Sequence, residues 1–90
     1  MAVTVKIPTT FRGLVRGKAE VPASGKTIGE VLRDLDSRYA GLWEQLCEEE
    51  GIRKAVSVFL NGQDARFLKG LETPVADGDE LSIVTALAGG

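Results

Sequence analysis

The sequence predicts an α+β domain in which one sheet packs against a single main helix. Short segments with alternating apolar and polar residues occur in both halves of the chain, and this period of two is typical of strands with one buried face. Between them, residues 28–39 carry apolar side chains three and four positions apart, as an amphipathic helix does. We therefore expect the order strand, strand, helix, strand, short strand, strand.

Composition narrows the possible functions. The 90 residues predict one domain over residues 1–85, followed by a C-terminal tail over residues 86–90. The 11 basic and 13 acidic residues are spread along the chain without a basic stripe, so we expect no nucleic-acid partner. With one cysteine and no histidine, zinc fingers and Ser-His-Asp triads are excluded. No apolar run approaches the ~20 residues of a membrane span, and we expect a cytoplasmic protein with no membrane partner.

The first two strands are predicted from alternation and from proline. Residues 3–7 alternate between apolar and polar, and Pro8 ends the run because proline has no amide to donate. Residues 12–17 form a polar turn region. Residues 18–21 alternate again until Pro22, so we expect a hairpin whose second strand ends there.

The main helix begins at a recognisable cap. Thr27 and Glu30 have the capping-box spacing, in which the threonine oxygen accepts from a free amide and the glutamate reaches back to the cap. Ala40-Gly41 closes the helix. We expect one apolar stripe to face the core, made of Ile28, Val31, Leu32, Leu35 and Tyr39.

Residues 42–50 connect the helix to the second half. Leu42, Trp43 and Leu46 indicate a short second helical turn, and residues 48–51 are expected to form a solvated acidic loop. Cys47 is expected to pack partly rather than react, because neighbouring carboxylates raise the pKa of a thiol.

The second half contains three strand signals. Residues 56–60 alternate and lead into Asn61-Gly62, a strong hairpin signal because both positions need positive φ. Residues 64–68 are expected to return as a short edge strand. Residues 77–79 form a turn, and residues 81–85 make the final strand.

Two apolar residues are expected on the sheet face away from the helix. Phe59 and Val84 point away from the helix if the residues that alternate with them face it, because side chains alternate along a strand. Those residues are Val56, Val58, Leu60, Leu81 and Ile83. Phe59 and Val84 would form, together with Leu87, a small docking patch for a partner. The alternative is that they are ordinary exposed strand residues.

The C-terminal residues 86–90 read Ala-Leu-Ala-Gly-Gly. Gly89 and Gly90 have no Cβ and can pass through a narrow tunnel. Five extended residues reach roughly 16 Å, at about 3.3 Å each. The alternative is a frayed terminus without a function.

Several stretches together resemble the ubiquitin-like β-grasp sulfur carriers, which include the molybdopterin synthase small subunit and the thiamine-pathway carrier. These stretches are Thr27 to Leu32, Asn61-Gly62, Asp77 to Glu80 and the terminal Gly89-Gly90. The resemblance implies a mixed sheet of four to five strands packed on one main helix, followed by a flexible tail. The tail is most similar to that of the carrier of actinobacterial cysteine synthesis. Thr85 and Leu87 depart from the proline and valine common there, which leaves the pathway open.

The resemblance also implies a function and its residues. An adenylating enzyme related to the ubiquitin activators would use ATP and magnesium to activate Gly90, which then becomes a thiocarboxylate. Leu87, Ala88 and Gly89 would thread the partner's site, and a second, sulfur-accepting enzyme would receive the sulfur. The chain itself would hold no cofactor, metal or catalytic residue and would be a monomer when free. The alternatives are a molybdopterin synthase small subunit, a protein modifier conjugated through Gly90, and a non-covalent binding module.

Overall fold

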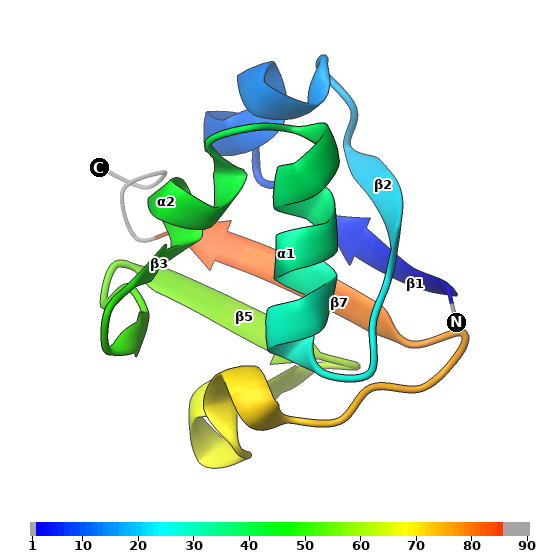
Figure 1. Ribbon diagram of the computed structural model, residues 1–90, viewed down its shortest axis with the longest axis vertical. Helices are drawn as coiled ribbons and strands as arrows, with labels where there is room; N and C mark the ends of the chain where they lie inside the picture. Colours follow the sequence, from blue (N-terminus) through cyan, green and yellow to red (C-terminus); the bar gives the residue numbers. More distant parts are fainter. Residues whose placement is uncertain (1, 86–90) are drawn as a thin grey trace.

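The computed structural model describes residues 2–85, in which a five-stranded sheet is covered on one face by the main helix (Figure 1). The strand order across the sheet is β2-β1-β7-β5-β6. The elements that form these two layers are β1 (Ala2–Lys6), β2 (Glu20–Ser24), α1 (Ile28–Arg38), β5 (Val56–Leu60), β6 (Gln63–Asp64) and β7 (Glu80–Thr85).

The sheet is mixed, because β1 and β7 run parallel while all its other pairs are antiparallel. Val5 of β1 lies beside Leu81 of β7, and Leu81 in turn lies opposite Leu60 of β5. The first and last strands therefore occupy neighbouring places in the middle of the sheet. This arrangement confirms the predicted order of elements and the mixed sheet that the family resemblance implies.

The core lies between α1 and the inner face of the sheet. Alternate residues of β1, β5 and β7 are buried, as their period of two predicts. Fully burying one such aliphatic side chain contributes roughly 1.5–3 kcal/mol. The helix supplies its predicted stripe, of which all but the half-buried Tyr39 are fully enclosed: Ile28, Val31, Leu32 and Leu35.

The N-terminus of α1 is capped, although not entirely as predicted. The Thr27 hydroxyl accepts from the Glu30 amide at 3.2 Å. The Glu30 carboxylate, however, accepts from the amide of Lys26 at 3.0 Å, one residue before the cap. The Lys26 carbonyl meanwhile accepts from the Val75 amide at 3.0 Å. Residues 26–27, just before the helix, therefore pair like a strand with residues 74–75, which lead towards β7.

Pro22 does not end the second strand, as was predicted, but lies in its middle opposite Thr4. β2 is an edge strand, so a residue without an amide is tolerated where its backbone points away from the partner strand. The Pro22 carbonyl does point away, since it accepts from Arg38 at 2.6 Å. The strand begins later and continues further than alternation alone indicated.

The polar turn expected over residues 12–17 is instead largely a 3-10 helix, η1 (Thr9–Val15). Phe11 and Val15 are buried by it and extend the core beyond the end of the sheet. Arg16 and Gly17, both with positive φ, end this helix. Two core residues were missed because a short helix with polar neighbours lacks a clear period.

The prediction of a short edge strand over residues 64–68 is also wrong for most of that range. Asn61 and Gly62 form the predicted tight turn with positive φ, but β6 then lasts only two residues. The Asp64 carboxylate accepts from the Arg66 amide at 2.9 Å and starts the 3-10 turn η2 (Ala65–Phe67). Local side-chain capping therefore replaces the strand ladder here.

A smaller layer lies beside α1. The predicted second helical turn is α2 (Leu42–Leu46), which leads into the strand pair β3 (Cys47–Glu48) and β4 (Gly51–Ile52). The acidic residues 48–50 are exposed as predicted, but Glu48 and Gly51, both expected in a loop, pair with each other in this small hairpin. Another 3-10 turn, η3 (Gly70–Glu72), contacts both α1 and β4.

Candidate functional site

The base of the C-terminal tail is held firmly in the sheet. Thr85, the last residue of β7, is 5% exposed and lies opposite Val56 of β5. Its hydroxyl oxygen is 3.5 Å from that of Thr10. The predicted sulfur attachment residue, Gly90, and the predicted threading residues Gly89, Ala88 and Leu87 lie outside the described residues. The described structure therefore fixes the point from which the tail departs.

The outer face of the sheet carries both predicted docking residues. Val84 is opposite Ser57 and Phe59 is opposite Ser82, so Val84 and Phe59 are diagonal neighbours on the face away from α1. Val84 is 48% exposed and Phe59 is half-buried. Their predicted orientation is confirmed, and their role in docking stays a prediction.

A cationic side chain that sequence reasoning missed lies on the same face. One terminal nitrogen of Arg66, Nη2, donates to Ser57 Oγ at 2.6 Å and to the Val56 carbonyl at 3.3 Å. Its Nε is 3.7 Å from a carboxylate oxygen of Asp64. Because Ser57 is the partner of Val84, the guanidinium lies next to the exposed valine. The sequence did contain a signal for this turn, because Asp64 precedes Arg66 by two residues, which is the spacing of an Asx turn.

Cys47 is buried rather than partly packed, and its pKa is raised for a reason other than the one predicted. The residue is only 2% exposed, and burial raises the pKa of the Cys47 thiol to about 11, while the guanidinium groups of Arg33 and Arg53 partly oppose this rise. Desolvation rather than neighbouring carboxylates is therefore the cause. A thiol in this environment is protonated at neutral pH and is a poor place to carry sulfur.

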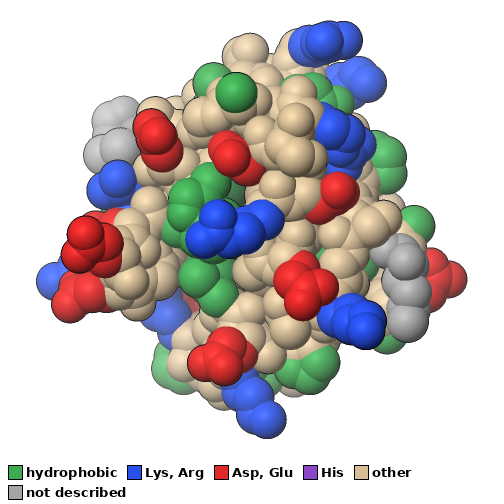
Figure 2. All heavy atoms as spheres, viewed as in Figure 1, with side chains coloured by type: hydrophobic (Ala, Val, Ile, Leu, Met, Phe, Trp, Pro, Cys, Tyr) green, Lys and Arg blue, Asp and Glu red, His purple; other side chains and the backbone are tan. Residues whose placement is uncertain are grey.

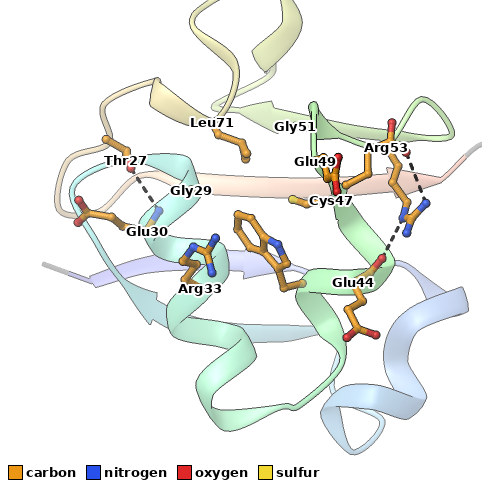
Figure 3. Close-up of a pocket in the computed structure, with 12 residues that line it drawn as sticks. Thr27, Gly29, Glu30, Arg33, Glu44, Cys47, Glu49, Gly51, Arg53 and Leu71 are labelled. Atoms are coloured by element: carbon orange, nitrogen blue, oxygen red, sulfur yellow. Dashed lines mark hydrogen bonds and ion pairs between the residues drawn. The ribbon is translucent and has the colours of Figure 1, made fainter.

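On the helix side of the molecule, an open groove of about 750 Å³ lies between α1, α2, the β3–β4 hairpin and η3 (Figure 3). Arg33, Cys47 and Leu71 point into it from three different elements. The Arg33 guanidinium lies over the Trp43 ring, 4.0 Å from the ring centroid. Figure 2 shows this face, where hydrophobic side chains are crossed by basic ones and surrounded by acidic ones.

Within residues 2–85, no three Asp, Glu, Cys or His side chains are grouped so that they could hold a metal ion. Every buried side-chain nitrogen or oxygen in that range has a hydrogen-bond partner. The same residues contain no helix with the length and apolar character that crossing a bilayer requires. The expectation that the chain binds no cofactor stays a prediction.

The sheet order, the single main helix and the parallel central pair place the chain in the ubiquitin-like β-grasp class. Residues 5–90 match the model of the ThiS family. The chain therefore belongs to the ThiS family.

Characterised proteins agree with this assignment. The chain is 42% identical to the sulfur carrier protein CysO of Mycobacterium tuberculosis and 34% identical to small archaeal modifier protein 3 of Haloferax volcanii, with both chains covered completely in each comparison. It is also similar to CysO in the crystal structure of the Amycolatopsis orientalis BexX/CysO complex, with 44% identity and a TM-score of 0.93. That match covers 98% of this chain and 99% of the other.

Proposed function

We propose that this protein is a sulfur carrier in which the Gly90 carboxylate is adenylated and then converted to a thiocarboxylate. The sulfur is passed to a biosynthetic enzyme that makes cysteine or another sulfur-containing metabolite. The observation that supports this most directly is the ThiS family match, which extends through residue 90. The full-length similarity to CysO favours the cysteine branch.

The proposed chemistry begins at a weak electrophile. An α-carboxyl has a reference pKa of about 3.3–3.7, so Gly90 is an anion at neutral pH. The activating enzyme uses magnesium-bound ATP, forms a bond between a Gly90 carboxylate oxygen and the α-phosphorus, and releases pyrophosphate. Hydrosulfide then attacks the carbonyl carbon, the bond to AMP breaks, and the terminus becomes a thiocarboxylate. The partner enzymes supply the catalytic groups, and this chain is their substrate.

In this proposal the body of the protein provides position and recognition. Thr85 is fixed in the sheet, so the terminal carboxylate can reach roughly 16 Å from it if the five remaining residues are extended. Val84 immediately precedes that point and is exposed on the outer face, beside the exposed Arg66 and the half-buried Phe59. An activating enzyme that contacts this face is well placed to receive the tail. Glycine at positions 89 and 90 keeps the end narrow.

A second candidate is a protein modifier, favoured by the similarity to small archaeal modifier protein 3. Its first step forms the same adenylate, but a lysine amine of another protein then attacks the Gly90 carbonyl. The product is an isopeptide bond rather than a thiocarboxylate. A non-covalent binding module would need neither step, and its tail would be dispensable.

Intact mass spectrometry separates these candidates. The full chain is incubated with its cognate activating enzyme, ATP, magnesium and sulfide. A carrier exchanges one oxygen for one sulfur, whereas a modifier becomes attached to a lysine of another protein. Deletion of Gly90 should abolish loading while thermal unfolding stays unchanged. A truncated chain that still gains sulfur would overturn the proposed mechanism.

A further inference from the structure

The groove beside α1 combines an apolar interior with a mostly acidic rim. Trp43, Leu71 and Cys47 provide the apolar part. Four glutamates and two arginines are also among its lining residues, an excess of two acidic side chains: Glu30, Glu44, Glu48, Glu49, Arg33 and Arg53.

Several of these charged groups are already engaged inside the protein. Arg53 donates to the Glu44 carbonyl at 2.8 Å and lies 3.6 Å from the Glu48 carboxylate. The Glu30 carboxylate accepts from the Lys26 amide. Among residues 2–85, no ion pair forms at the carboxylates of Glu44 and Glu49, and both residues are exposed. These two side chains are therefore available for an external cation.

The groove adjoins a smaller hollow at the base of the tail. This hollow of about 320 Å³ is lined by Thr85 and Gln45, and it shares Glu44 and Arg53 with the larger groove. Figure 1 shows the end of β7 next to α2. A molecule bound along the groove can thus extend to the point where the tail leaves the body.

We propose that this groove is a second docking surface, occupied by a basic segment of a partner protein that also receives the tail. The inference rests on the proposed function, because it assumes that Gly90 is delivered to partners. Lysine or arginine side chains of the segment pair with Glu44 and Glu49, and an apolar side chain covers Trp43 and Leu71. The excess negative charge of the rim selects a basic partner over an acidic one.

This surface is separate from the outer face that carries Val84. The groove lies on the α1 side of the sheet, whereas Val84 and Phe59 point to the opposite side. Both surfaces approach Thr85, one through Glu44 and the other through Val84. A carrier recognised in turn by two enzymes can therefore present a different surface to each while offering both the same tail.

The test uses the full chain and a defined probe, an acetylated and amidated peptide of alternating lysine and leucine. Trp43 is the single tryptophan, so its fluorescence reports on the groove directly. In nuclear magnetic resonance spectra of the labelled protein, we expect shifts at the Trp43 indole and at the amides of Gly29 and Gly51. Residues Phe59 and Val84 should be unaffected. A matching peptide of glutamate and leucine should not bind.

Charge-neutral variants identify the carboxylates responsible. The double variant Glu44→Gln with Glu49→Gln should bind the basic peptide several-fold more weakly. The control, Glu20→Gln with Glu80→Gln, removes the same formal charge from the other side of the sheet, where Glu80 pairs with Lys6 at 3.5 Å, and should leave binding unchanged. Circular dichroism verifies that each variant is folded. Binding should also weaken with added salt, because exposed charge pairs are screened.

Several results would overturn the proposal. They are absence of peptide binding, equal weakening in the control variant, shifts centred on Phe59 and Val84, and a dimer in sedimentation equilibrium whose formation shifts the Trp43 indole resonance. The peptide titration needs no activation of Gly90, whereas the proposed function is tested by the mass of the loaded chain. Failure of one experiment is therefore distinguishable from failure of the other.

Discussion

The guanidinium carbon of Arg33 lies 4.0 Å from the centroid of the Trp43 ring, and this contact joins α1 to α2. A cation over an indole face at a partly exposed site contributes about 0.5–1 kcal/mol. We expect Arg33→Ala to lower the free energy of unfolding by that amount and to change the fluorescence of native Trp43. Urea denaturation measures both effects. Lys18→Ala, an exposed control, should change neither.

Leu32→Ala tests the assignment of the helix stripe. Leu32 is fully buried between α1 and the sheet, and its truncation should leave a cavity. We expect a loss of about 2–5 kcal/mol in the free energy of unfolding, measured in urea. A loss below about 0.5 kcal/mol, the range of surface substitutions, would contradict this packing. Lys26→Ala serves as the exposed comparison.

Cys47 should react slowly with iodoacetamide in the native protein. Burial raises the pKa of the Cys47 thiol from 9.0 to about 11, so the native state holds this proton over a range in which the unfolded chain has lost it. The resulting contribution to stability is present below pH 9.0 and is lost as pH rises through about 11.

We therefore expect the alkylation rate of Cys47 to keep rising with pH and to level off only as pH passes about 11, as followed by mass spectrometry. The chain unfolded in urea, in which the thiol is solvated, provides the control. Rapid labelling of the folded protein near neutral pH would show that the thiol is accessible and ionised after all.

Val84→Asp tests the outer docking face more directly than Phe59→Asp does. Val84 is 48% exposed, so a carboxylate there should cost little stability but should disrupt an apolar contact with the activating enzyme. We expect weaker binding in calorimetric titrations with that enzyme. Thr4→Asp, on the same face but on β1, is the matched control.

Equal affinity of Val84→Asp and the unaltered protein would refute a docking role for this face. Phe59→Asp is less informative, because the half-buried Phe59 side chain makes a loss of stability difficult to separate from a loss of contact.

The sequence predicted those parts of the fold that depend on local periodicity. The alternation in β5 and β7 and the stripe from Ile28 to Leu35 each show their buried face directly. The orientation of Val84 followed from the same alternation. Thr27 was correctly predicted to cap α1 because its hydroxyl acts on an amide only three residues away.

Features that depend on contacts between distant parts of the chain could not be predicted from the sequence. Pro22 lies inside β2 because its carbonyl faces a helix residue rather than β1, which alternation cannot reveal. Phe11 and Val15 join the core only because η1 closes one end of it. The pKa of Cys47 is controlled by burial, whereas the sequence displayed only its neighbouring charges.

The position of β7 has a mechanical consequence. The strand that leads into the tail pairs with β1 over residues 80–82 and with β5 over residues 81–85, so its first half is held along both edges and its second half along the β5 edge. A pull on the tail along the axis of β7 would load these bonds together in shear rather than one residue at a time. A partner enzyme could therefore draw the terminus tightly into its active site without unravelling the domain to which it is attached.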